Sequence, residues 1–161
     1  MNIFNKDITI IIPTFQEEKS IKKTVMNIHN FLNIKALDFE IIVVDDNSND
    51  KTGLIMNEIV KSVNTVSFIL STKVKGFGNS VVQGLEIAKG EYIAIMMADM
   101  SDSPDDLFNY YNELKSDINL DCIFGDRWSS GQIKNYPLLK RLINRIGNNI
   151  ISLLFKTSYK D

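Results

Sequence analysis

The 161-residue sequence predicts an α/β domain in which helices cover both faces of a mostly parallel β-sheet. Three observations support this prediction. Short runs rich in Ile and Val alternate with longer segments of helical periodicity, a pattern typical of parallel sheets. The hydrophobic content of 44% is sufficient for a substantial core, and the length suits one domain. No internal repeat or low-complexity tract interrupts the alternation.

The β-branched runs predict five strands, at residues 8–14, 39–46, 65–71, 91–99 and 120–126. Each is followed by a predicted helix, at 17–33, 51–62, 78–89, 104–116 and 137–155. The stretch Tyr92 to Met97 is expected to be a buried strand. Asp105 and Asp106 are expected in the first turn of the next helix, because Pro104 suits the first helical position and acids suit a helix amino terminus.

Composition bounds the compartment and the partners. Cys122 is the only cysteine, so no disulfide can form within these residues, and a reducing compartment is expected. Its apolar neighbours predict that the thiol packs in the interior. The amino-terminal apolar run, interrupted by Lys6 and Asp7, does not resemble a signal peptide. No apolar run reaches the roughly 18 residues that a membrane span requires.

The net charge of −2 conceals an asymmetry. Residues 1–126 carry 11 Lys/Arg and 19 Asp/Glu, whereas residues 127–161 carry 7 and 1. A basic segment on an acidic domain suggests a phosphate group or an anionic membrane surface as partner, and no nucleic acid is expected. A solvated basic helix explains the charge equally well.

Ligands of open α/β sheets bind beyond the carboxyl ends of the strands, and several predicted strand ends carry acids or turn formers. Asp45 and Asp46 end the second strand and point to opposite faces, so one of them is expected to face a ligand. Residues 47–50 are interpreted as a turn and helix cap. Gly76 and Gly78 precede a helix and would let a ligand approach the backbone, although they match neither GxGxxG nor a P-loop.

Metal binding by nitrogen or sulfur is not expected. His29 is the only histidine and has no acid placed to assist it, so a structural role is favoured. Any bound metal must therefore have oxygen ligands, which favours Mg²⁺ or Mn²⁺.

Residues 135–155 place apolar side chains on one helical stripe and Lys140, Arg141 and Arg145 on the other side. Such a helix could cover the core, or lie on a membrane with its arginines at lipid phosphates.

Four stretches, "ITIIIPTFQEE", "FEIIVVDDNSNDKT", "KGFGNSVVQGLEIAKGEYIAIMMAD" and "GDRWSSG", together resemble family 2 of the inverting glycosyltransferases, which have the GT-A nucleotide-sugar fold. The branch that they resemble most is the dolichyl-phosphate mannosyltransferase and polyprenyl-phosphate glycosyltransferase group. The resemblance implies a GT-A core over residues 1–126 and an acceptor- and membrane-proximal segment over 127–161, truncated relative to the family.

The resemblance also implies site residues. The donor nucleotide sugar would contact the family positions that are here Pro13, Thr14, Phe15, Glu17, Asp46, Lys75, Gly76 and Asp99. Asp99 matches the last aspartate of the DxD motif, which holds the divalent cation. Arg127 and Arg141 fall where acceptor phosphate is bound, so Asp99 and Arg127 are expected to carry the catalysis.

The sequence departs from the family at Met97, where DxD has its first carboxylate; methionine is a poor ligand for hard cations. Asp102 is a hypothetical replacement. Gln16 also stands where Asn is common.

The implied reaction moves a sugar from a nucleoside diphosphate to a polyprenyl phosphate, at the cytoplasmic face of a membrane. The acceptor oxygen is then already anionic and needs no general base, in keeping with the lack of acids in residues 127–160. An alternative enzymatic function is the extension of a glycan or polysaccharide. An alternative from another class is a nucleotide-sugar-binding module with weak catalytic activity.

Overall fold

The computed structural model describes residues 5–125, 146–147, 149–150 and 153–154. The chain divides into two compact units, Met1–Ser116 and Asp117–Asp161. The functional division at residue 126 that the resemblance implied stays a prediction.

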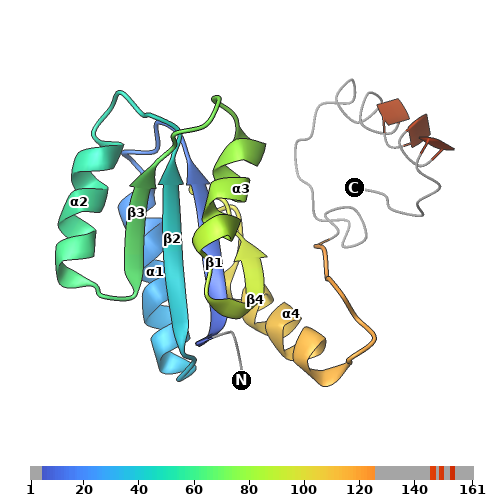
Figure 1. The fold of residues 1–161 in the computed structure, drawn as a ribbon. Helices are drawn as coiled ribbons and strands as arrows, with labels where there is room; N and C mark the ends of the chain where they lie inside the picture. Colours follow the sequence, from blue (N-terminus) through green and yellow to red (C-terminus); the bar gives the residue numbers. More distant parts are fainter. Residues whose placement is uncertain (1–4, 126–145, 148, 151–152, 155–161) are drawn as a thin grey trace. The chain divides into compact units, whose positions relative to one another are not determined.

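The first unit contains one four-stranded sheet with helices on both faces (Figure 1). In chain order its elements are β1 (Lys6–Thr14), α1 (Ile21–Ile34), β2 (Phe39–Asp45), α2 (Thr52–Ser62), β3 (Val66–Leu70), α3 (Phe77–Ile87), β4 (Gly90–Ile95) and α4 (Pro104–Ser116). The strand order is β3-β2-β1-β4, and every pairing is parallel. The predicted α/β class and parallel sheet are confirmed.

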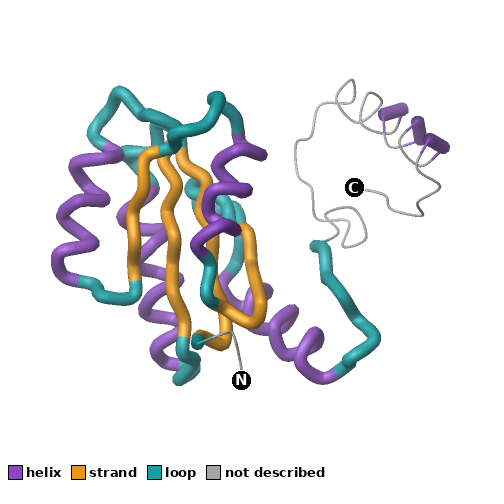
Figure 2. The backbone as a smooth tube through the Cα atoms, in the orientation of Figure 1, coloured by secondary structure: helices purple, strands orange, loops and turns teal. Residues whose placement is uncertain are grey.

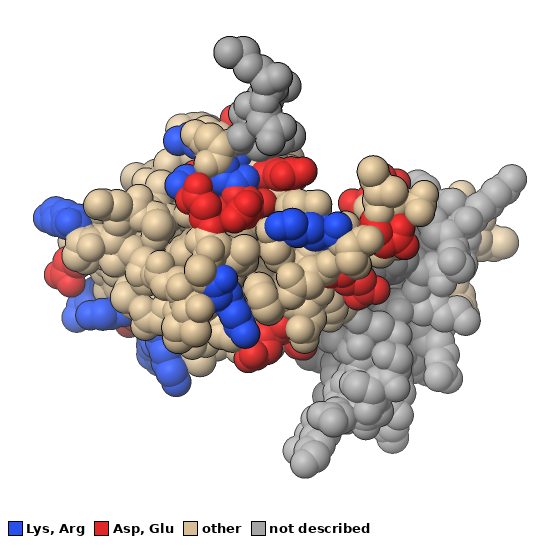
Figure 3. Space-filling view, turned by 90° about the horizontal axis from the view of Figure 1, so that it is seen from below, with Lys and Arg blue, Asp and Glu red and all other residues tan. Residues whose placement is uncertain are grey.

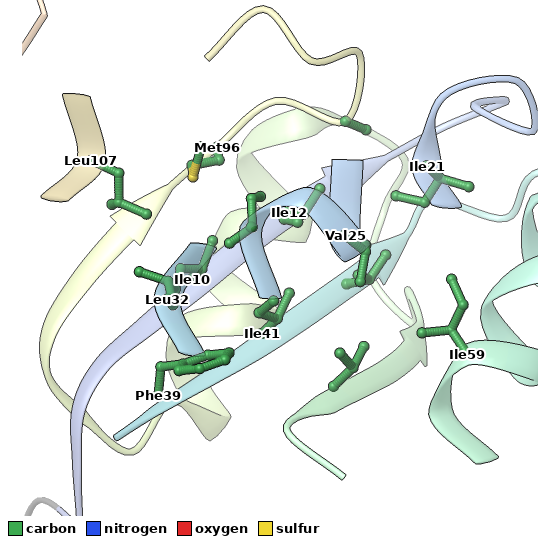
Figure 4. Packing of buried hydrophobic residues seen from close by; sticks show 14 of the residues in the cluster. Ile10, Ile12, Ile21, Val25, Leu32, Phe39, Ile41, Ile59, Met96 and Leu107 are labelled. Atoms are coloured by element: carbon green, nitrogen blue, oxygen red, sulfur yellow. The ribbon is translucent and has the colours of Figure 1, made fainter. Parts of the chain in front are cut away.

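The main core lies between the sheet and α1, α2 and α4 (Figure 4). Ile10 and Ile12 point from β1 toward Val25 and Leu32 of α1, and all four side chains are fully buried. The alternate β1 residue Ile11 faces the other side of the sheet, where it meets α3 near Gly84. The central strands are therefore buried on both faces, which is why they read as continuous Ile/Val runs.

β4 differs from the prediction because, among the strands that the structure describes, it lies at the edge of the sheet. It ends at Ile95, earlier than the expected residue 99, and only one of its faces is well covered. Ile93, Ile95 and Met97 are 39%, 48% and 39% exposed. The expectation of a buried strand from Tyr92 to Met97 was thus wrong for every second residue. A strand beside a single neighbour is shielded by fewer elements.

The predicted strand at 120–126 is wrong over the residues that the structure describes. Residues 120–125 form no strand, and Leu120 and Phe124 are 37% and 61% exposed. Cys122 is exposed as well, which corrects the expectation of an interior thiol. β-propensity and apolar character are not sufficient for a strand, because a strand exists only by pairing with another.

The amino ends of the strands form a surface of mixed charge. Lys6 and Asp38 pair at 2.6 Å where β1 begins and β2 is about to begin. Figure 3 views this end, and its described basic and acidic side chains are interspersed with uncharged residues. The acids and loops considered for function lie at the opposite, carboxyl end of the sheet.

Candidate functional site

The loops that follow β1, β2 and β3 gather at the carboxyl end of the sheet (Figure 2). The loop after β1 is joined to the loop after β2 by hydrogen bonds. The backbone N–H of Gln16 donates to Ser48 Oγ at 2.7 Å, and that of Glu17 donates to Thr52 Oγ1 at 2.9 Å. Glu18 N–H donates to Asp50 Oδ2 at 3.1 Å. The two loops are consequently one cross-linked structure before any ligand binds.

These bonds support the interpretation of residues 47–50 as a structural turn, but the N-cap of α2 is Lys51, just after that range, and Lys51 makes no side-chain capping bond. Asp50 Oδ1 also accepts from the N–H of Thr52, the first residue of α2, at 2.9 Å. Desolvation raises the pKa of the Asp50 carboxyl, but hydrogen bonds from Thr52 and Glu18 outweigh it and lower the pKa from its usual value. Asp50 is accordingly a charged structural group at neutral pH.

Two non-glycine residues in these loops have left-handed backbone conformations. The φ angles of Gln16 and Asn47 are 58° and 59°. Asn tolerates this conformation because its short side chain can bond locally, whereas Gln has no such advantage. Gln16 is held there by its N–H bond to Ser48 and by a 2.5 Å bond from its side-chain amide to Asn49 Oδ1. The departure from the family's Asn is thus offset by loop contacts.

Asp46 is one of two buried acids where β2 ends, beside Asp45. Its N–H donates to the carbonyl of Thr14 at 2.8 Å, and its Oδ2 accepts from the N–H of Gly76 at 2.8 Å. The residue is only 6% exposed, and within the described part of the chain its Oδ1 has no hydrogen-bond partner. A buried acceptor without a donor costs free energy, so a ligand N–H or O–H would be favoured there.

The backbone conformation at residue 76 requires glycine. Its φ of 146° is a conformation that residues with a Cβ rarely adopt, and the turn it makes presents its N–H to Asp46. Gly78, by contrast, lies inside the first turn of α3 and not before the helix, so the expectation of two pre-helical glycines holds only for Gly76.

Phe15 and Lys75 meet across two loops. The Lys75 Nζ lies 3.5 Å from the centroid of the Phe15 ring, a cation–π contact, and both side chains are exposed. Pro13 and Thr14 are buried at the end of β1, where the Thr14 hydroxyl donates to the carbonyl of Ile12 at 3.1 Å, and their predicted contact with the donor stays a prediction. Glu17 is partly buried, and its carboxylate accepts a hydrogen bond from the Ser20 hydroxyl.

A second group of acids lies in the turn after β4. Asp99 is exposed, and its Oδ1 accepts from the N–H of Ser101 at 2.9 Å. Asp102 Oδ2 accepts from the backbone N–H of Met97 at 2.6 Å. The turn folds the Asp102 carboxylate back onto the residue that replaces the first DxD aspartate. Both groups offer carboxylate oxygens, which suit Mg²⁺ or Mn²⁺.

The described residues by themselves offer few metal ligands. No group of three or more His, Cys, Asp or Glu side chains that could hold a metal occurs in the described residues. The loop containing Asp46 and the turn containing Asp99 follow β2 and β4, which flank β1. Two inter-strand spacings separate these strands by about 10 Å.

His29 makes contacts through both of its ring nitrogens. Its Nδ1 is 3.0 Å from Thr65 Oγ1, its Nε2 is 2.9 Å from the amide nitrogen of Asn33, and its ring packs edge-on against Phe39. Both ring nitrogens are used in structural contacts, so the predicted structural role is confirmed.

Arg127 and Arg141 lie outside the described residues. Of the predicted helix at 137–155, the described residues 146, 147, 149, 150, 153 and 154 are helical. In the part of the chain with described placement, no helix is both long enough and apolar enough to span a membrane.

Thr24 was not singled out from the sequence. It lies on the buried stripe of α1, and its Oγ1 donates to the carbonyl of Ala98, next to Asp99, at 2.7 Å. The sequence could have indicated this role, because Thr24 shares the apolar stripe of α1 with Ile21, Val25 and Ile28, and a hydroxyl buried among apolar side chains needs a hydrogen-bond partner.

Comparison with known proteins agrees with the geometry. The family model described as glycosyl transferase family 2 matches residues 9–157. The chain belongs to glycosyl transferase family 2.

Two curated relatives of this family 2 chain are similar in sequence. One is a dolichol-phosphate mannosyltransferase of Pyrococcus furiosus, 31% identical over 86% of this chain and 38% of the relative. The other is the poly(ribitol-phosphate) beta-N-acetylglucosaminyltransferase TarP of Staphylococcus aureus, 33% identical over 82% of this chain and 40% of the relative. The chain thus spans about two fifths of the length of these relatives.

Solved structures share the fold. The mannosyltransferase PcManGT of Pyrobaculum calidifontis, in complex with GDP-Man and Mn²⁺, matches with a TM-score of 0.59 and 24% identity over 69% of this chain and 34% of that one. Residues 1–349 of S. aureus TarS, in complex with UDP-GlcNAc, match with a TM-score of 0.52 and 24% identity over 68% of this chain and 31% of that one. The GT-A fold expected from the sequence is confirmed.

Proposed function

We propose that this domain binds a nucleoside-diphosphate sugar and transfers the sugar, with inversion, to a polyprenyl phosphate at the cytoplasmic face of a membrane. The donor site is inferred mainly from the buried carboxylate of Asp46. One of its oxygens accepts a hydrogen bond from the N–H of Gly76, and the other has no donor among the described residues. That oxygen would accept a hydrogen bond from the base or the ribose. Phe15 and Lys75 add an exposed aromatic ring and a cation beside the same loops.

The diphosphate would extend from Asp46 toward the turn after β4. Asp99 would hold the divalent cation there. Asp102 would supply the second carboxylate, which the family has at the position of Met97. A bound Mg²⁺ or Mn²⁺ would neutralise the charge that develops on the departing diphosphate. Because the described residues offer so few protein ligands, the donor's own phosphate oxygens would supply others.

The acceptor assignment rests on Arg127 and Arg141. Arginine binds phosphate in a bidentate way, and both residues fall in the basic segment 127–161. A phosphate acceptor needs no general base, and this segment contains no acid before Asp161. The relative named as a dolichol-phosphate mannosyltransferase supports the same class of acceptor.

A glycan or polysaccharide acceptor is the second candidate. It is favoured by the similarity to TarP, whose name specifies poly(ribitol-phosphate). A hydroxyl acceptor would require a general base within hydrogen-bond reach. A third possibility, a binding module with little activity, is suggested by Met97, because one family carboxylate is absent there.

Donor binding is tested by titrating GDP- and UDP-sugars into wild type and Asp99→Ala, with and without Mn²⁺. We expect metal-dependent binding to wild type that is lost in Asp99→Ala, because the cation would lose its principal protein ligand. Asp106→Ala is the control, since it removes another exposed acid nearby in the chain, from the first turn of α4. If folded wild-type protein binds no nucleotide sugar, the donor site is refuted.

Acceptor use is tested by measuring sugar transfer to polyprenyl phosphate. We expect Arg127→Ala to slow transfer while leaving donor affinity nearly unchanged, because the lost guanidinium would contact only the acceptor. Arg145→Ala removes the same charge from the same segment and is expected to transfer normally. Equal rates in wild type and Arg127→Ala would remove Arg127 from this role. Donor binding without transfer to lipid phosphate or glycan would favour the binding module.

A further inference from the structure

Thr24 connects α1 to the turn that contains Asp99. Its side chain is buried, with 4% exposure, and its Oγ1 lies 2.7 Å from the Ala98 carbonyl oxygen. The same hydroxyl is 3.2 Å from the Ser20 carbonyl, the bond that a helical threonine often makes to the preceding turn. A hydroxyl has one proton, so the shorter contact to Ala98 identifies the main acceptor.

The bond lies just beyond the last sheet contact of β4. The N–H of Met96 still donates to Ile11 of β1 at 3.0 Å, and the chain then leaves the sheet. The bonds of Met97 to Asp102 and of Ser101 to Asp99 are formed within the turn. Thr24, in contrast, belongs to a separate element and fixes the peptide group that immediately precedes Asp99.

The amino end of α1 adjoins the loop after β1, where the donor sugar nucleotide is proposed to bind. α1 starts directly after the loop that carries Phe15 and Glu17, and the Glu17 carbonyl accepts from the N–H of Ile21 at 2.9 Å. Helix α1 therefore begins beside the loop that carries Phe15 and Glu17, and its Thr24 hydroxyl bonds the carbonyl of Ala98, next to Asp99.

We propose that Thr24 is a positioning residue, which orients the Asp99 carboxylate toward the cation by holding the Ala98 carbonyl. This inference rests on the proposed function, because it assumes that Asp99 binds the cation. Partners of metal-binding groups hold their ligands in the geometry that the metal requires, and their loss typically weakens metal affinity by about 10- to 100-fold. Without the hydroxyl, the buried Ala98 carbonyl would lose this donor and the turn could shift.

The test compares Thr24→Val, which removes the hydroxyl at nearly constant shape, with Thr24→Ser, which keeps it. The full 161-residue chain is used, and Mn²⁺ affinity is measured by electron paramagnetic resonance with GDP or UDP present. We expect Thr24→Val to bind Mn²⁺ about 10-fold more weakly and Thr24→Ser to bind within about 3-fold of wild type. If Thr24→Val is too unstable to purify, Thr24→Ala replaces it.

Thr9→Val is the matched control. Thr9 is fully buried and its hydroxyl also makes hydrogen bonds, to Glu40 and from the N–H of Gly90, but it lies on β1 at the opposite end of the sheet. We expect this variant to lose stability and keep wild-type Mn²⁺ affinity.

The possible results separate the two proposals. Unchanged Mn²⁺ affinity in Thr24→Val, with affinity lost in Asp99→Ala, overturns the role of Thr24 and leaves the donor site intact. Equal weakening in Thr24→Val and Thr9→Val also overturns it, because general destabilisation then explains the effect. Absence of Mn²⁺ and nucleotide binding in the wild type overturns both proposals.

Discussion

At residue 97 a methionine stands where the family has a carboxylate, and the side chain of Asp102 in the following turn is bonded to its backbone. Met97 is 39% exposed, and its N–H is bonded to the Asp102 carboxylate at 2.6 Å. Asp102 thus brings negative charge close to the family position without occupying it. A thioether adds little to the binding of a hard cation, so we expect the site to bind metal more weakly than one with an intact DxD motif.

Restoring the carboxylate tests this explanation. Met97→Asp is expected to increase Mn²⁺ affinity by about 10-fold, because an oxygen ligand at the motif position would bind the hard cation directly. Isothermal titration calorimetry in the presence of nucleotide provides the measurement. Met100→Asp adds the same charge to the same turn away from the motif position, and little change is expected. An unchanged dissociation constant for Met97→Asp would show that position 97 does not face the cation.

At the scale of elements, α3 supports the loop containing Lys75 and Gly76 and packs closely on β1. A Cβ at Gly84 would lie 2.5 Å from Ile11 Cγ2, and Ile11 is fully buried. Real Cβ contacts are essentially never this short, so only glycine allows the observed approach. The position of α3, and with it that of Gly76 beside Asp46, depends on this contact.

Gly84→Ala is expected to reduce the free energy of unfolding by about 1–3 kcal/mol, because the added methyl overpacks the interface between helix and sheet. Gly78→Ala is the matched control in the same helix, where an added Cβ has nothing within 4 Å. It is expected to stabilise the protein by about 0.5–1 kcal/mol, since alanine favours helices. Urea denaturation measures both. Equal effects of the two substitutions would contradict the close-packing argument.

At the scale of the whole molecule, the parallel sheet assembles the site from separate parts of the chain. The strand order β3-β2-β1-β4 places β1 between the strand that ends near Asp46 and the strand that leads to Asp99. A nucleoside diphosphate bound across the carboxyl end of β1 would contact both the loop with Asp46 and the turn with Asp99. Binding to the folded state alone should therefore stabilise the unit against unfolding.

Donor and cation together are expected to raise the melting temperature. At a donor concentration of 100 times Kd the stabilisation is about 2.7 kcal/mol, which corresponds to several degrees for a domain of this size. Differential scanning fluorimetry with a nucleotide sugar and Mn²⁺ measures the shift, and EDTA should remove it. A shift of the same size in Asp99→Ala would show that stabilisation arises elsewhere.

The sequence by itself determined the class of fold and most of its elements. The Ile/Val runs of β1 and β2 and the Pro104 start of α4 are local patterns, and local patterns are what periodicity and capping rules detect. The tertiary structure decided which residues meet: Asp46 with Gly76, Phe15 with Lys75, and Thr24 with Ala98. It also decided against a strand at 120–125, because strand formation requires a neighbouring strand. Contacts between distant parts of a chain depend on sheet order and loop geometry, for which no single stretch of sequence carries a signal.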